Sequence, residues 1–263
     1  MLTTMKVTII GGGNMGGAIA RGLAKGTLVK AEDITVSDPF QGILDALKAD
    51  CPAINVTSNN EEAIVGADIV MLAVKPWLVE RIITPLNLDP TRQIFIPIAA
   101  GIGFDKLLRW VAPGIPIFRV MPNIGIMHLE SMSLITSCNA TKEQEQLVLD
   151  LFNEMGVAML MPEDNFPAAT ALASCGIAYV MKYMQAAMQA GIELGLYPQQ
   201  ALELVAQSVK GAATLIQKNH SHPSVEIDKV TTPGGITIKG INELDHGGFS
   251  SAVIKAMKAS CVK

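Results

Sequence analysis

The stretch VTIIGGGNMGGAIARGL at residues 7–23 decides the fold of this chain. Its apolar start is typical of a buried strand, and its alanine-rich end is typical of a helix. Between them, Gly11, Gly13 and Gly16 have the G-x-G-x-x-G spacing of a dinucleotide-binding turn. The first glycine allows the tight turn, the second lets a pyrophosphate approach the backbone, and the third lets the helix pack on the strand. The sequence therefore predicts a dinucleotide site, and an ordinary glycine-rich turn is the alternative.

Short β-rich runs alternate with helical runs from Met5 to about Met161, which predicts an α/β fold with a Rossmann-type, doubly wound parallel sheet. We expect strands at 6–10, 33–37, 69–73, 93–97, 117–121 and 133–137, and helices at 14–25, 41–49, 77–83, 104–111 and 142–154. Gly156 is expected to cap the last of these helices. After Met161 the β-rich runs stop. We therefore predict a dinucleotide-binding domain at 1–161 and an all-α domain at 162–263.

The second domain is expected to open with a long helix from Pro167 to Glu193, bent near Gly176, and to continue with a helix from Pro198 to about Lys218. Small residues gather on the first helix, at Ala186, Ala187, Ala190 and Gly191. They let another helix approach closely. That helix belongs either to the same core or to a second subunit.

A second glycine-containing loop lies at residues 231–237, Thr-Thr-Pro-Gly-Gly-Ile-Thr, before a further helical run. Such a loop delivers backbone amides to a helix start, where they favour an anion. Because no Lys or Arg follows before Lys239, a carboxylate suits this loop better than a phosphate. A simple turn is an equally good interpretation.

The net charge of −4 and the absence of a basic block give no reason to expect nucleic acid as a partner. The four cysteines are scattered without a C-x-x-C pair, and His220 and His222 lie in a polar segment typical of a loop, so we expect no metal site. The chain shows no signal segment at residues 1–5 and no apolar run of membrane-spanning length. We expect a cytoplasmic protein with a small-molecule substrate.

The second predicted strand ends at Ser37, and Asp38 follows it, near the expected position of an adenosine ribose. An acid there accepts hydrogen bonds from the ribose and repels a 2′-phosphate, and no Lys or Arg lies between Ser37 and Leu47. The local sequence therefore favours NADH over NADPH, although Ser37 could serve a phosphate. Asp38 as a turn residue before Pro39 is the alternative.

Five motifs in order make the chain resemble the pyrroline-5-carboxylate reductase family. They are residues 11–23, Ala73-Val74-Lys75-Pro76, Ala99-Ala100-Gly101, Arg119-Val120-Met121-Pro122-Asn123, and Thr232-Pro233-Gly234-Gly235-Ile236-Thr237-Ile238 followed by Gly247-Gly248-Phe249. The region from Ala171 to Tyr179 adds to the likeness. The resemblance implies a nucleotide-binding domain followed by a helical dimerisation domain. It also implies a homodimer or a ring of dimers whose active site is shared between subunits.

The family's reaction is reduction of a cyclic imine, 1-pyrroline-5-carboxylate, to proline by NADPH or NADH, the last step of proline synthesis. By motif match, the Thr237 hydroxyl would hold the imine nitrogen, although it could instead only cap a helix. The glycine loop, the end of the second strand and the resemblance together give the expected binding residues. For the substrate these are Pro233, Gly234, Gly235, Met121 and Asn123; for the cofactor they are Gly11, Gly13, Asn14, Met15, Gly16, Ser37, Asp38, Asn59, Ala73, Lys75 and Pro76. Lys75 as a solvated surface charge is an open alternative.

The chain departs from the family pattern at Ile124, Cys175, Ile177 and Ile236. These departures make the expected pocket more apolar and less hydroxylated, which changes what a buried site discriminates. A reductase of another cyclic imine or of a small keto acid is therefore an alternative. A cofactor-binding paralogue without turnover is a third, against which the presence of Thr237, Gly234 and Gly235 argues.

Overall fold

The structure, a computed structural model, describes residues 5–261. The expectation that the chain opens without a signal segment falls mostly on residues 1–4, outside the described residues. The chain divides into two compact units, Met1–Ser174 and Cys175–Lys263. The strands end at Leu160, where the sequence predicts the change to helices, while residues 161–174 belong to the first unit. The domain boundary after residue 161 stays a prediction.

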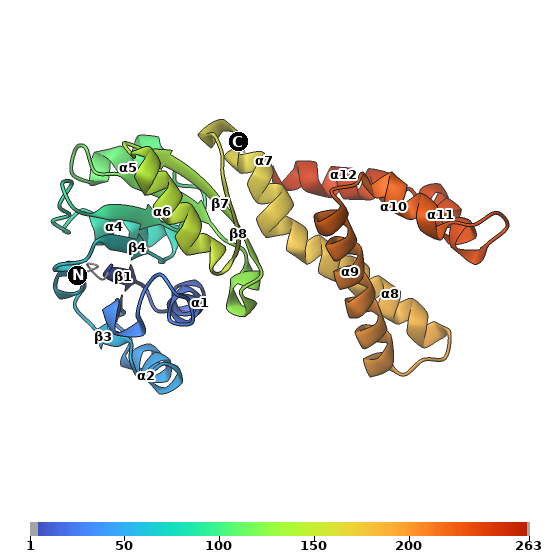
Figure 1. Ribbon diagram of the computed structural model, residues 1–263, viewed down its shortest axis with the longest axis horizontal. Helices are drawn as coiled ribbons and strands as arrows, with labels where there is room; N and C mark the ends of the chain where they lie inside the picture. The colour runs from blue at the N-terminus through green and yellow to red at the C-terminus, as the bar shows by residue number, and fades with distance from the viewer. Residues whose placement is uncertain (1–4, 262–263) are drawn as a thin grey trace. The chain divides into compact units, whose positions relative to one another are not determined.

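Within the described residues, the first unit holds one eight-stranded sheet in the order β3-β2-β1-β4-β5-β6-β7-β8 (Figure 1). The strands are β1 (Val7–Ile10), β2 (Ile34–Ser37), β3 (Asn55–Thr57), β4 (Ile69–Leu72), β5 (Ile94–Pro97), β6 (Ile117–Met121), β7 (Ser131–Cys138) and β8 (Gly156–Leu160). The α-helices are α1 (Asn14–Leu23), α2 (Gln41–Asp50), α3 (Asn60–Ile64), α4 (Val79–Ile83), α5 (Phe104–Trp110), α6 (Lys142–Asn153) and α7 (Phe166–Thr170). Short 3₁₀ turns are η1 (Ala31–Asp33), η2 (Pro76–Leu78), η3 (Ile124–His128) and η4 (Glu163–Asn165). The predicted Rossmann-type fold is confirmed.

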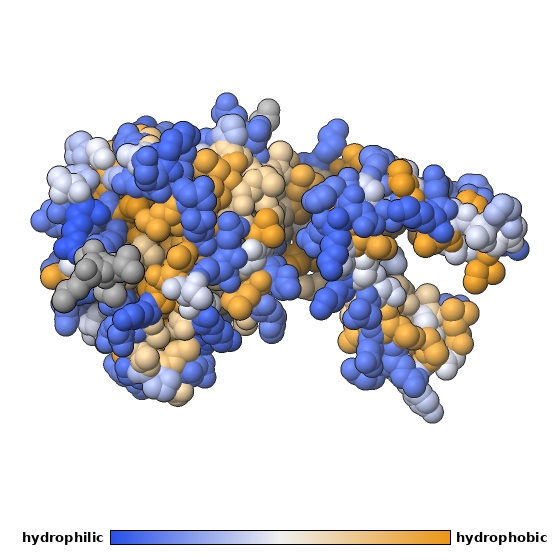
Figure 2. Space-filling model, viewed as in Figure 1, coloured by the Kyte–Doolittle hydropathy of each residue, from blue (hydrophilic) through white to orange (hydrophobic). Residues whose placement is uncertain are grey.

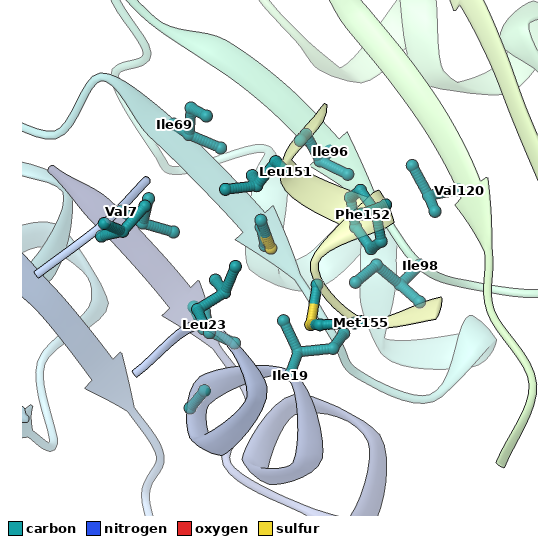
Figure 3. Packing of buried hydrophobic residues seen from close by; sticks show 14 of the residues in the cluster. Val7, Ile19, Leu23, Ile69, Ile96, Ile98, Val120, Leu151, Phe152 and Met155 are labelled. Atoms are coloured by element: carbon teal, nitrogen blue, oxygen red, sulfur yellow. The ribbon is translucent and has the colours of Figure 1, made fainter. Parts of the chain in front are cut away.

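Strand β4 is central and buried on both faces, so its side chains alternate between two separate cores. Ile69 and Met71 join the core under α1 and α6, which Figure 3 shows with Leu23 and Phe152 packed against the strands. The neighbouring positions on β4 join the core under α3, α4 and α5. The run of apolar residues at 69–74 thus fixes the middle of the sheet, as the sequence predicts.

Three features of the sheet differ from the sequence prediction. Strand β7 runs antiparallel to β6, because the connection over residues 122–130 is too short for the crossover that a parallel partner needs. Strands β3 and β8 are additional to the predicted set. Gly156 does not cap α6, whose C-cap is Glu154; it opens β8 with φ of +136°, and a Cβ there would lie 2.2 Å from the carbonyl oxygen of Ser131.

The second unit is helical, with α8 (Gly176–Glu193), α9 (Pro198–Asn219), α10 (Pro223–Val230), α11 (Ile236–His246) and α12 (Phe249–Ser260). The predicted helical stretch from Pro167 to Glu193 is confirmed as α7, a π-helical turn η5 (Ala171–Cys175) and α8 in succession. Pro198 opens α9 at its first position, also as predicted. Helix α10 is additional to the sequence prediction.

Helices α8 and α9 pack against each other, and an added Cβ at Gly191 would lie 3.0 Å from the Cβ of Ala201. The hydroxyl of Tyr179 bonds Ser260 and so joins α8 to α12. Among the described residues of helices α8–α12, Gly176 and Ala201 are the buried ones. Figure 2 shows hydrophobic residues at the surface of these helices. This unit by itself therefore leaves much apolar surface exposed to water.

In the described part of the chain, no helix is both long and apolar enough to cross a membrane.

Candidate functional site

A cleft of about 840 Å³ lies beside the glycine loop of the first unit. It is lined by Ile10 and Ser37 at the ends of β1 and β2, and by Ala73 and Ile98 just after β4 and β5. These strands are parallel, so their carboxyl ends meet at one edge of the sheet. Ligands of open α/β sheets bind at this edge.

The glycine loop is held closely against the strands. The amide of Gly11 donates to the carbonyl oxygen of Ser37 at 2.7 Å, and a Cβ at Gly11 would lie 2.6 Å from the carbonyl oxygen of Ala73. A Cβ at Gly16 would lie 1.9 Å from the carbonyl oxygen of Gly11, so α1 can approach β1 only with glycine there. Gly13 differs, because a Cβ there would meet nothing within 4 Å. The space beside Gly13 is open to a ligand.

Helix α1 begins after Gly13 without a side-chain cap from any described residue. The first amides of a helix have no partner within the helix, so those of Asn14 and Met15 are available to an anion. Both residues and Gly13 line the cleft. These features fit the pyrophosphate of a dinucleotide. The backbone packs closely at Gly11 and Gly16, the space at Gly13 is open, and the first amides of α1 are free beside it.

Asp38 is nearly buried at the end of β2, with 6% of its surface exposed. One of its carboxylate oxygens accepts the amide hydrogen of Gly12 at 2.8 Å, and the other accepts that of Phe40 at 3.0 Å. The neighbouring hydroxyl of Ser37 donates to Oδ1 of Asn60 at 2.6 Å. Asp38 therefore holds the glycine loop and its own turn, as the turn interpretation requires. The preference for NADH that was inferred from its charge stays a prediction.

The segment after β4 lines the middle of the cleft with Ala73, Lys75 and Pro76, all predicted as cofactor residues. Asn59 lies elsewhere: its side chain caps α3 by accepting the amides of Glu61 and Glu62, and it lines a neighbouring hollow. Asn60, which the sequence did not predict, lines the cleft. The cofactor roles of these residues stay predictions.

Two predicted substrate residues, one at the end of β6 and one just after it, do not line this cleft. Asn123 is nearly buried, accepts the amide hydrogen of Gly125 at 2.9 Å and donates to the carbonyl oxygen of Ala173 at 3.1 Å. Met121 ends β6 and pairs with Leu134 of β7. Ile124, one of the departures from the family pattern, does line the cleft. The substrate roles of Met121 and Asn123 stay predictions.

The predicted carboxylate loop lies in the second unit, immediately before α11. Gly234 has φ of +70°, and the amide of Gly235 donates to the carbonyl oxygen of Thr232 at 2.9 Å. Gly235 is the N-cap of α11, and no described side chain caps the helix. The amides left free at this helix start are thus those of Ile236, Thr237 and the next residue. The side chains of Pro233 and Thr237 are exposed.

Among residues 5–261, no group of three or more His, Cys, Asp or Glu side chains is placed to hold a metal ion.

Comparison with known proteins gives two family matches. Residues 163–263 match the model described as pyrroline-5-carboxylate reductase dimerisation, and residues 6–101 match NADP oxidoreductase coenzyme F420-dependent. The second match covers the first strands of the sheet and the glycine loop. The dimerisation match covers α8–α12 completely.

Relatives align along almost the entire chain. Pyrroline-5-carboxylate reductase 1 and 2 of Dictyostelium discoideum are each 34% identical over 98% of this chain; the chain spans 49% of the first and 91% of the second. The pyrroline-5-carboxylate reductase of Methanosarcina acetivorans is 34% identical, with 98% of each protein covered.

A solved structure agrees with these alignments. A pyrroline-5-carboxylate reductase from Coxiella burnetii superposes with a TM-score of 0.91 at 29% identity, over 98% of this chain and 97% of that one. Relatives named pyrroline-5-carboxylate reductase thus match this chain at 34% identity over 98% of its length, and the chain belongs to the pyrroline-5-carboxylate reductase family.

Proposed function

We propose that this chain reduces 1-pyrroline-5-carboxylate to L-proline with a nicotinamide dinucleotide, NADPH or NADH, as the reductant. The observation that carries the proposal is the cleft beside the glycine loop, where the start of α1 and the open space at Gly13 lie together. The Pro-Gly-Gly loop leads into a second helix start without a side-chain cap, at α11. Each helix start offers backbone amides to an anion, and the two anions of this reaction are a pyrophosphate and a carboxylate. The alignment with named reductases over 98% of the chain supports the same reaction.

The cofactor's pyrophosphate is assigned to the amides of Asn14 and Met15, beside the open space at Gly13. When bound, a nicotinamide dinucleotide supplies the hydride that reduces the imine carbon. The solved pyrroline carboxylate reductase of Plasmodium falciparum, 29% identical with a TM-score of 0.86, contains NADP. Lys75 and Pro76 line the cleft that extends from the glycine loop, and we assign them to the cofactor as well. The preference for NADH that the sequence predicted rests on the charge of Asp38 alone, and both oxygens of that carboxylate accept backbone amide hydrogens.

The substrate carboxylate is assigned to the Pro-Gly-Gly loop, at Pro233, Gly234 and the free amides at the start of α11. Thr237, at the second position of α11, then offers its hydroxyl to the imine nitrogen. The nitrogen gains an electron pair as the carbon accepts hydride, so a hydroxyl that donates a hydrogen bond or relays a proton favours the reduction. No covalent intermediate with the protein is needed.

We propose that the active form is a homodimer or a ring of dimers in which two subunits share each site. The match of residues 163–263 to a dimerisation family supports this assembly. The second unit adds a physical reason, because α8–α12 bury so few of their own residues within the described chain. A second copy of these helices would remove the exposed apolar side chains from water.

Reduction of another cyclic imine or of a small keto acid is the second candidate. The observation that favours it is Ile124, which lines the cleft and is 54% exposed there, where the family pattern has a different residue. An added apolar side chain changes which substrates a pocket accepts.

Steady-state assays with the full chain test the proposal. NADH and NADPH oxidation is followed with 1-pyrroline-5-carboxylate, with a six-membered cyclic imino acid and with small keto acids, and proline is identified by chromatography. We expect the highest kcat/KM for 1-pyrroline-5-carboxylate with stoichiometric proline. Higher kcat/KM for another substrate would replace the proposal with the second candidate, and cofactor binding without any turnover would identify a non-catalytic paralogue.

A further inference from the structure

Arg81 lies in α4 and lines the glycine-loop cleft together with Ser37 and Asn60. It also lines the adjoining hollow, together with residues 58–61, which follow β3. Strand β3 is the neighbour of β2 at the sheet edge. Arg81 therefore lies at the end of the cleft beside β2 and β3, away from the end lined by Ile98 and Ile124.

This end of the cleft is where a dinucleotide places its adenosine. In doubly wound folds, the pyrophosphate lies at the start of the first helix and the adenosine ribose at the end of the second strand. Here that strand is β2, and Ser37 is its last residue. The group that distinguishes NADPH from NADH, the 2′-phosphate of this ribose, would thus lie near Ser37, Asn60 and Arg81.

The charged residues that line this end of the cleft and the adjoining hollow are Arg81, Asp38 and Glu61. Both carboxylate oxygens of Asp38 accept backbone amide hydrogens, which offsets part of its negative charge. Arg81 is exposed, and none of the ion pairs among the described residues includes it. Glu61 lines the adjoining hollow as well. The Arg81 guanidinium remains available for a ligand.

We propose that Arg81 binds the 2′-phosphate of the cofactor and so enables this protein to use NADPH. The proposal rests on the proposed assignment of the cleft to a nicotinamide dinucleotide. A guanidinium suits a phosphate because its planar donors bind two oxygens at once. Asn60 supports the assignment: its Oδ1 accepts the Ser37 hydroxyl, which orients the Nδ2 amide to donate to the same anion. The cation that is missing between Ser37 and Leu47 in the sequence is thus supplied by α4.

Calorimetric binding of 2′,5′-ADP and 5′-AMP to the full chain tests this proposal without turnover, because the two ligands differ in the 2′-phosphate. The variants are Arg81→Gln and Arg81→Lys, with Arg109→Gln on α5 as an exposed arginine outside the cleft. We expect the native chain to prefer 2′,5′-ADP and Arg81→Gln to lose about tenfold or more of that preference, as for hydrogen bonds to a charged group. Affinity for 5′-AMP should stay within about twofold, since 5′-AMP lacks the phosphate that Arg81 binds. Arg81→Lys should keep part of the preference and Arg109→Gln all of it.

Two results with the variants would overturn the proposal. One is an unchanged preference in Arg81→Gln, and the other is an equal loss in Arg109→Gln. If the native chain binds both ligands equally and still reduces the imine with NADH, the proposal about Arg81 fails while the proposed function stands. If it binds neither ligand, the cleft is not a dinucleotide site and both proposals fail.

Discussion

The Asp38 carboxylate accepts the amide hydrogen of Gly12 at 2.8 Å, and this contact ties the end of β2 to the glycine loop after β1. This hydrogen bond therefore joins two loops that are far apart in the sequence. The second oxygen of Asp38 accepts the amide hydrogen of Phe40 and fixes the turn that leads to α2. The carboxylate at this position therefore has a structural role in holding the glycine loop, whether or not it also contacts a ligand.

Replacing Asp38 with asparagine should lower the free energy of unfolding by about 1–3 kcal/mol, because one carbonyl oxygen cannot accept both buried amides with the strength of a charged acceptor. We expect NADH and NADPH affinity to fall by similar factors, since the displaced loop carries the pyrophosphate site. Urea denaturation and fluorescence titration measure the two effects. Asp45→Asn, on the exposed face of α2, is the matched control. A selective loss of NADH affinity would instead show that Asp38 contacts the ribose.

Alanine substitutions at Gly13 and Gly16 should affect stability and cofactor binding differently. Gly13→Ala places a methyl group in open space, so stability should change by about 1 kcal/mol or less, while the methyl group blocks the approach of the pyrophosphate. Gly16→Ala forces a Cβ against the carbonyl oxygen of Gly11 and should cost about 1–3 kcal/mol or more. Thermal unfolding and cofactor titration of both variants test this contrast. Equal destabilisation by the two substitutions would contradict it.

Thr237 should affect catalysis without affecting folding. Its side chain is exposed at the start of α11, so Thr237→Val should leave the Tm nearly unchanged. Loss of a hydroxyl that assists proton transfer should lower kcat by about 10²-fold or more, with a smaller change in the cofactor KM. Thr237→Ser keeps the hydroxyl and should restore most of kcat. Full activity of the valine variant would show that this hydroxyl takes no part in catalysis.

Glu226 should make the α9–α10 junction sensitive to acid. Its carboxylate accepts hydrogen bonds from Lys229 at 2.8 Å, from the Ser221 hydroxyl and from Asn219, and these lower the pKa of Glu226 from 4.5 to about 2. The pKa of Glu226 is thus higher in the unfolded chain than in the folded chain, so the unfolded chain binds this proton more tightly. The contribution of this group to stability is therefore complete above pH 4.5 and is lost as the pH falls toward 2.

Thermal unfolding of the native chain and of Glu226→Gln across this pH range measures that contribution. The glutamine variant should be less stable near neutral pH, and the difference from the native chain should shrink as the medium becomes more acidic. A difference that does not depend on pH would show that Glu226 acts only through packing.

The strands that the sequence failed to predict are those with weak local signals. Strand β3 is three residues long, Asn-Val-Thr, and its side chains remain partly or fully exposed. Strand β8 includes Val157 and Met159, which face solvent at 52% and 49% exposure, so it lacks the apolar run of a central strand. Both lie at sheet edges, where pairing with a neighbour rather than side-chain burial stabilises the strand.

Within the candidate site, local pattern predicted the glycine loop, because it lies in one short segment with its own geometric requirement. The family resemblance predicted the residues after β4. Asn60 and Arg81 were missed for the opposite reason. Neither belongs to a motif, and each reaches the cleft only because β3 and β4 lie on either side of the β2–β1 pair in the sheet order.

The sequence by itself determined the alternation of strands and helices, the buried centre of the sheet and the two glycine-containing helix starts. Each of these follows from local sterics and hydrophobic periodicity, which neighbouring residues fix without distant partners. Only the tertiary structure decided the reversal of β7, the use of the Asp38 carboxylate by Gly12, and the presence of Arg81 beside the end of β2. These depend on strand order and loop length, which bring distant residues together and have no signature within any single segment.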